Sequence, residues 1–138
     1  MKKLTAAVVL DENEGMMIFG KRQSRDRVLV ADFVSSVGEK NVYVSPFSRV
    51  IFEPHQKVNI VDNPFVDAKD GGACFNECFP LAPYIDMIET LIVYRWNELY
   101  PSDVKLDINL EKAGFKLTAV SEFEGSSHER ITKEVYVK

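Results

Sequence analysis

Cysteine, histidine and tryptophan are scarce in this sequence: its 138 residues contain two, two and one of them. Two cysteines cannot build a disulfide scaffold, so we expect a reduced, cytoplasmic protein. No apolar run reaches the roughly 18 residues that a membrane-spanning helix needs, so no membrane partner is expected. The short apolar run after Lys2 and Lys3 leads into acidic residues where a signal peptide has its cleavage site, so it is not a signal peptide.

Established metal and phosphate motifs are missing as well. Cys74, Cys78, His55 and His128 do not match the ligand spacing of a zinc finger. The sequence contains neither a Walker loop nor the Gly-x-Gly-x-x-Gly pattern of dinucleotide-binding folds. From the sequence we therefore expect no metal and no cofactor.

What is present is an ordinary globular composition, with 46% hydrophobic and 28% charged residues. A net charge of −4 excludes a basic field over the whole protein but leaves local basic patches possible. The pattern predicts one domain over residues 1–138, of the α+β class, with a mostly antiparallel sheet of about eight strands and one or two helices.

Apolar periodicity locates these elements. Strands are predicted over Leu4–Leu10, Met16–Gly20, Asn41–Ser45, Lys57–Val61, Thr90–Asn97, Lys105–Leu110, Phe115–Phe123 and Ile131–Val137, with a further short one over Ala73–Phe79. The clearest helix spans residues 25–37, with Ser24 as its N-cap and Gly38 ending it. Residues 63–72 read as a loop. A short helix over 83–89 is favoured before the strand at 90–97, although helix and strand both fit residues 81–97.

The first candidate site is the basic start of the predicted helix. Arg22 and Arg25, with the hydroxyl of Ser24, stand where free backbone N–H groups and a partial positive charge attract anions. This placement predicts a cradle for a phosphate or carboxylate. The alternative is a solvated surface on which the arginines pair with Asp26 or Asp32.

The second candidate site follows the predicted strand at 90–97. Arg95, Trp96 and Asp103 lie in a segment that also holds two tyrosines. Aromatic faces stack on bases, and an arginine pairs with phosphate, so this segment predicts ligand binding. The alternative is a core strand whose aromatic side chains pack inward.

The third candidate site surrounds His128. Histidine is the usual acid or base near neutral pH, so His128 with Glu129 is the candidate catalytic pair, and Lys133 is a candidate ligand-binding residue. Because neighbouring side chains rarely face one another, partners for the imidazole must come from elsewhere in the chain. The alternative is a solvent-exposed histidine beside a helix-capping pattern.

Three segments together resemble a family of small bacterial proteins of unknown function found in anaerobic Firmicutes. They are 22–27 (RQSRDR), 94–103 (YRWNELYPSD) and 127–134 (SHERITKE). Some members carry the label ribonuclease Z. Those enzymes need a His-x-His-x-Asp-His cluster for two zinc ions, and the two histidines of this chain do not supply it. The resemblance therefore points to the three segments and implies no mechanism.

If the three segments converge, the sequence predicts a pocket for an anionic nucleotide-like or RNA ligand with metal-independent phosphodiester chemistry. Whether the protein is an enzyme stays open at this point. The alternative is a non-catalytic module that binds a protein partner or assembles with copies of itself.

Overall fold

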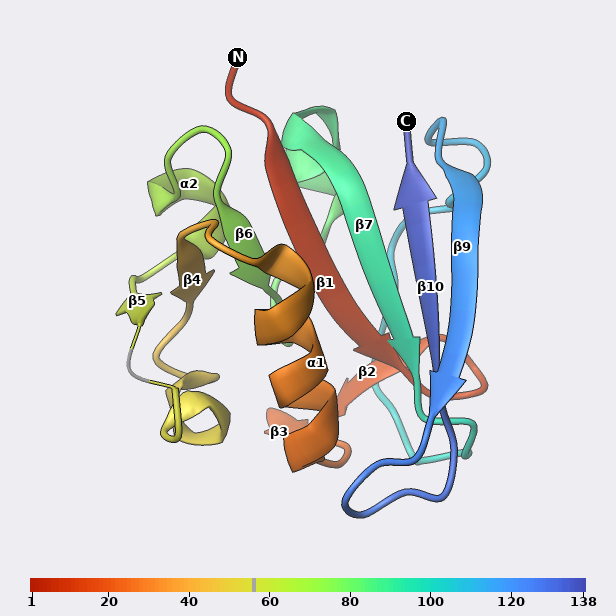
Figure 1. Ribbon diagram of the computed structural model, residues 1–138. Helices are drawn as coiled ribbons and strands as arrows, with labels where there is room; N and C mark the ends of the chain where they lie inside the picture. The colour runs from red at the N-terminus through yellow and green to blue at the C-terminus, as the bar shows by residue number, and fades with distance from the viewer. Residues whose placement is uncertain (56) are drawn as a thin grey trace.

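A seven-stranded sheet runs through the centre of the computed structural model, which describes residues 1–55 and 57–138 (Figure 1). Its strand order is β5-β4-β6-β1-β7-β10-β9. The strands are β1 (Leu4–Leu10), β4 (Val42–Val44), β5 (Val58–Ile60), β6 (Ala73–Phe75), β7 (Ile88–Arg95), β9 (Lys116–Phe123) and β10 (Ile131–Val137). A smaller sheet has the order β3-β2-β8, with β2 (Gly15–Ile18), β3 (Lys21–Arg22) and β8 (Val104–Lys105).

The α+β class is confirmed, and the large sheet is mixed rather than mostly antiparallel. Strands β5, β4, β6, β1 and β7 run parallel to one another, whereas β10 runs antiparallel to both β7 and β9. Parallel strands need crossover connections, which are usually helices. Here most crossovers are loops and short helical turns. The sequence predicts few helices and for that reason a mostly antiparallel sheet, which is wrong for strands β5, β4, β6, β1 and β7.

The helix α1 (Arg27–Val37) forms where the apolar stripe predicts it, and it buries Leu29, Val30, Phe33 and Val37 against the sheet. Gly38 ends the helix with a φ of 60°, a value that glycine adopts without strain. The N-cap is Asp26, whose carboxylate accepts from the backbone N–H groups of the first turn. The prediction of Ser24 as the cap is therefore wrong by two residues.

Short helical segments account for most other differences from the predicted elements. The predicted loop at 63–72 contains α2 (Pro64–Asp67), capped by Asn63, and the predicted helix at 83–89 is the 3₁₀ segment η2 (Ala82–Met87). A second 3₁₀ segment, η1 (Arg49–Phe52), follows β4. The strand predicted at 105–110 is confined to β8 (Val104–Lys105), and the residues after it follow an irregular path.

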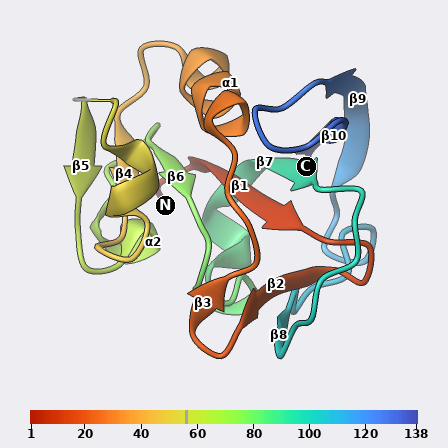
Figure 2. The same cartoon turned by 90° about the horizontal axis from the view of Figure 1, so that it is seen from below.

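The large sheet separates two apolar cores. Figure 2 shows α1 on one face and the β3-β2-β8 sheet on the other. Alternation along β1 directs Ala7 toward α1, and Val8 and Leu10 toward the small sheet. On β7, Tyr94 and the following Trp96 join the α1 core. In the described part of the chain, no helix is long and apolar enough to cross a membrane.

Candidate functional site

The imidazole of His128 is the point at which the three sequence segments meet. Its Nδ1 lies 3.0 Å from Oδ2 of Asp26, at the start of α1. Its Nε2 lies 3.0 Å from Oγ of Ser24 and 3.1 Å from the hydroxyl of Tyr100. The ring of Trp96 stacks on the imidazole with centroids 4.3 Å apart. The segments do converge, but around one buried side chain rather than around an open cleft.

The carboxylate of Asp26 holds this arrangement together. Oδ1 accepts from the backbone N–H groups of Val28, Leu29 and Ser126, and Oδ2 accepts from that of Ser127 in addition to its contact with His128. Burial alone raises the pKa of Asp26. The hydrogen bonds from His128 and the backbone outweigh that effect and hold the pKa well below its usual range. Asp26 is therefore an ionised acceptor that joins the 124–129 loop to the helix.

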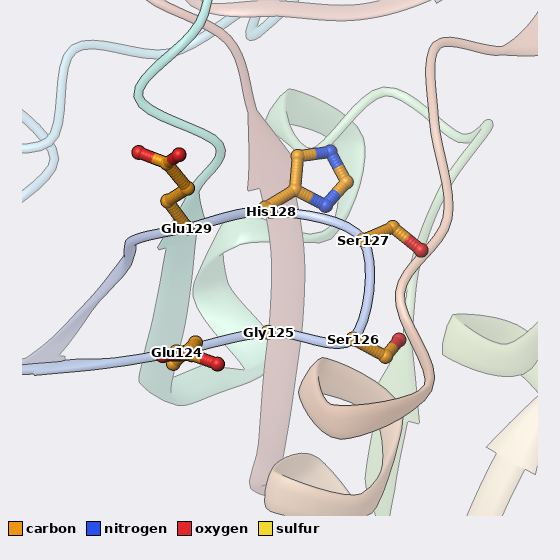
Figure 3. Close-up of a pocket in the computed structure, with 6 residues that line it drawn as sticks. All are labelled: Glu124, Gly125, Ser126, Ser127, His128 and Glu129. Atoms are coloured by element: carbon orange, nitrogen blue, oxygen red, sulfur yellow. The ribbon is translucent and has the colours of Figure 1, made fainter.

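The 124–129 loop connects β9 to β10 and surrounds an open hollow of about 600 Å³. Figure 3 shows the imidazole of His128 and the carboxylate of Glu129 leaving this loop in different directions. Glu129 is exposed, and the carboxylates near the imidazole are those of Asp26 and, at 3.9 Å, Glu98. The pairing of His128 with Glu129 is therefore replaced by a pairing with Asp26.

Two of the predicted ligand-binding arginines are occupied by carboxylates. Arg22 makes a two-point contact with Glu77, at 2.9 and 3.0 Å. Arg95 pairs with Glu134 at 2.8 Å and with Glu14 at 3.1 Å. Alternation along β7 also directs Arg95 to the sheet face opposite Trp96 and His128. Arg22 and Arg95 therefore stabilise the fold and do not converge on the imidazole.

The other predicted ligand residues have separate roles. Lys133 pairs with Asp32 at 2.9 Å, and that carboxylate also accepts from the buried hydroxyl of Tyr94. Asp103 accepts from the backbone N–H of Phe19 and so holds the turn between β2 and β3. Arg25 is exposed and takes part in none of the ion pairs within residues 1–55 and 57–138. Of the predicted arginines, only Arg25 keeps a positive charge available for a ligand.

A small hollow lies at the carboxyl ends of β1 and β6, beneath the start of α1. Its apolar lining is Val9, Leu29, Val30, Ile51, Phe75 and Trp96, and its polar lining is Ser24, Arg25, Asp26 and Glu77. The volume is about 10 Å³, which is the space of one water molecule. Ligands of open α/β sheets bind beyond the carboxyl ends of the parallel strands, which makes this the position to examine first.

Sequence reasoning missed two members of the site. The sequence analysis names Asp26 as an alternative partner for the arginines, and it includes Tyr100 only as one of two tyrosines in a segment. An Asp two residues after a serine, immediately before a strong apolar stripe, is a signal for an N-cap that could have identified Asp26. Nothing local in the sequence places Tyr100 beside His128.

Thiol and metal chemistry find little support in the geometry. Burial raises the pKa of the Cys74 thiol to about 12 and also raises the pKa of Cys78, so neither thiol is an activated nucleophile. Among the residues that the structure describes, no group of three or more His, Cys, Asp and Glu side chains could hold a metal ion.

Comparison with known proteins identifies the fold. Neither the protein-family models nor the curated proteins give a match. Among the matching solved structures is dihydrofolate reductase from Enterococcus faecalis complexed with NADP(H) and RAB-propyl. It superposes with a TM-score of 0.67 over 98% of this chain and 95% of that chain, at 11% sequence identity. The chain therefore has a fold similar to that of dihydrofolate reductase.

This likeness corrects the functional hypothesis drawn from the sequence. The hypothesis of a nucleotide-like or RNA ligand with phosphodiester chemistry is wrong in its RNA and phosphodiester parts, because the solved structure that matches is a dihydrofolate reductase complexed with NADP(H). The predicted partner, an anionic small molecule or RNA, is corrected in the same way, since the matching protein is described with NADP(H) and RAB-propyl and not with RNA. The positions of Arg22 and Arg95 agree with this correction, because both guanidinium groups are already paired.

Proposed function

We propose that this chain is a reductase that binds a folate-type ring at the carboxyl ends of β1 and β6, with NADP(H) as the hydride donor. The observation that carries the proposal is the hollow beneath α1, at the edge of the sheet where open α/β folds bind their ligands. The similarity to a dihydrofolate reductase complexed with NADP(H) supports it.

The lining of the hollow suits a planar, largely apolar ring. Leu29, Phe75 and Trp96 offer apolar and aromatic surface, and a few polar groups converge on it, as in most small-molecule sites. Arg25 is available to pair with the carboxylates that a folate-type molecule carries. Because the space now holds about one water, a ligand must move the lining outward, and the exposed Arg25 is the side chain freest to do so.

The fit to NADP(H) is less complete than the fit to the ring. The residues that follow β1 and β6 are Asp11 and Asn76, and neither is the start of a glycine-rich loop that cradles a pyrophosphate. Glu77 adds a negative charge to the lining, which Arg22 offsets. When bound, the cofactor supplies a hydride. The residues of the hollow position the ring and exclude water from it.

The single tryptophan makes this proposal directly testable, because Trp96 lines the hollow. Dihydrofolate is expected to change the fluorescence of Trp96 and to be reduced when NADPH is added. Arg25→Glu is expected to weaken dihydrofolate binding at least about tenfold, because it reverses the available charge. Arg27→Glu is the matched control, since Arg27 is exposed and does not line the hollow.

Two outcomes would contradict the proposal. Unchanged fluorescence at dihydrofolate concentrations up to about 1 mM would exclude the binding site, because substrates of enzymes bind more tightly than this. Binding without consumption of NADPH would exclude the reductase activity.

We also propose that the protein is cytoplasmic, which its two free cysteines support. Membership of the bacterial family suggested by the three sequence segments stays a prediction.

A further inference from the structure

Ser24, His128 and Asp26 are arranged in a line to which the proposed reductase function assigns no chemical step, although Ser24 and Asp26 also line its hollow. Oγ of Ser24 contacts Nε2 of the imidazole at 3.0 Å, and Nδ1 on the other side of the ring contacts the Asp26 carboxylate, also at 3.0 Å. A hydroxyl, an imidazole and a buried carboxylate in this order constitute the arrangement that activates serine nucleophiles on several unrelated folds. The three residues come from both ends of the chain, separated by about a hundred positions.

The environment of Asp26 decides which nitrogen of the imidazole carries the proton. The carboxylate is ionised and can only accept, so the neutral ring donates Nδ1–H to it. The lone pair of Nε2 then faces Ser24. Tyr100 also approaches Nε2, but its hydroxyl donates to Glu98 and leaves that lone pair to the serine. His128 is therefore set to accept the proton of the Ser24 hydroxyl.

The ring is also held in its orientation. The imidazole lies almost parallel to the Trp96 ring, at an interplanar angle of 23°, and both residues are buried. The side chain of Asp26 is fully buried, and five N–H groups fix its carboxylate. A base held this firmly by packing and by a third group meets the geometric requirement for general-base catalysis.

Ser24 itself contributes little to joining the loop to the helix, because Asp26 already makes those contacts. Ser24 is half-buried, whereas Asp26 and His128 are buried, so the hydroxyl stands on the more accessible side of the line. It also lies two residues before the N-cap of α1, where the partial positive charge of the helix favours a developing alkoxide. These features are those expected of a nucleophile rather than of a structural contact.

We propose that Ser24 is a nucleophile activated by His128, and that the chain has an acyl-transfer activity toward small esters. In the first step Oγ of Ser24 forms a bond to the acyl carbon while its proton passes to Nε2 of His128. The ester C–O bond breaks, and the alcohol leaves with that proton. Water then attacks the acyl-serine, gives a proton to Nε2, and releases the acid as the proton returns to Oγ. This activity does not depend on the proposed reductase function.

The test uses a fluorophosphonate, which phosphonylates activated serines with loss of fluoride, and peptide mass spectrometry to locate the label. The wild-type protein is expected to be labelled at Ser24, and Ser24→Ala is expected to remove all labelling. His128→Asn is expected to slow labelling roughly 100-fold, the usual loss when a general base is removed. Ser127→Ala is the matched control: it removes a hydroxyl from the 124–129 loop but keeps the backbone N–H that Asp26 accepts.

The thermal unfolding midpoint of each variant shows whether a loss of labelling comes from a missing catalytic group or from unfolding of the protein. Ser24→Ala and Ser127→Ala are expected to unfold at the wild-type temperature, so their labelling decides the question even if His128→Asn proves unstable. A wild-type protein without phosphonylated Ser24 would overturn the proposal. So would labelling that survives Ser24→Ala. Neither result bears on dihydrofolate binding, which is read separately from Trp96 fluorescence.

Discussion

Asp26→Asn is expected to lower the free energy of unfolding by about 4 kcal/mol, because at least two buried N–H groups lose their acceptor at a cost of about 1–3 kcal/mol each. Each carboxylate oxygen of Asp26 accepts from at least two N–H groups. An asparagine has one oxygen and one NH₂ group in place of the two carboxylate oxygens. In either orientation of the amide, the NH₂ group therefore points at N–H groups that also donate.

Asp32→Asn is the matched control on the same helix. Asp32 is partly exposed and accepts from Tyr94 and Lys133, so its loss is expected to lower the free energy of unfolding by only about 1 kcal/mol. Urea unfolding of the three proteins measures both effects. Equal losses for the two variants would show that Asp26 does not hold the loop and helix together.

The effect of Asp26→Asn should also depend on pH. Because the folded protein lowers the pKa of Asp26, the stability that its carboxylate contributes is fully present above the unfolded pKa of about 3.9. That stability is lost as the pH falls through the folded pKa. The gap between wild type and variant is therefore expected to shrink as the pH falls below about 4. A gap that widens in acid would contradict the lowered pKa.

Gly125→Ala is expected to lower the free energy of unfolding by about 3 kcal/mol, at the upper end for overpacking. A Cβ on Gly125 would overlap an oxygen of the Asp26 carboxylate and lie 2.7 Å from its Cγ and 2.8 Å from Cδ1 of Ile131. Asp26 cannot move aside without breaking its hydrogen bonds. The close approach of backbone to carboxylate, rather than an unusual φ, is what requires glycine here.

Gly20→Ala is the matched control, because it introduces backbone strain without any steric overlap. Gly20 has a φ of 72° with open space around it, so alanine there is expected to cost only about 1 kcal/mol of strain. Denaturant unfolding of both variants gives the comparison. A Gly125→Ala protein as stable as Gly20→Ala would mean that the loop can retreat from Asp26, and that the position of His128 is loosely held.

Local elements could largely be predicted from the sequence, but strand direction could not. The helix at 27–37 and the long strands at 4–10 and 131–137 follow from apolar periodicity and end signals. Periodicity says nothing about whether a neighbouring strand runs parallel. Strands β4, β5 and β6 have three residues each and are joined by irregular segments, so no local signal indicated the parallel half of the sheet.

The candidate site, too, could be predicted only in part from the sequence. Three segments were singled out, and the structure brings all three to His128. The residues that meet there are Ser24, Asp26, Trp96 and Tyr100 rather than Arg22 and Arg95. Arginines pair with carboxylates from distant positions in the sequence, as Arg22 does with Glu77. Only the tertiary fold determines which carboxylate lies beside each arginine. The charged segments of the sequence therefore indicated where the site lies, but the charged residues in them did not predict which side chains contact His128.

The most direct test of the central claim is the tautomer of the neutral His128 ring in the native protein, read from long-range proton–nitrogen NMR correlations. The chain has only two histidines, so assignment is straightforward. The hydrogen bond to Asp26 predicts a proton on Nδ1 and a bare Nε2 facing Ser24. A proton on Nε2 would contradict this account, because the imidazole could not then accept the proton of the Ser24 hydroxyl.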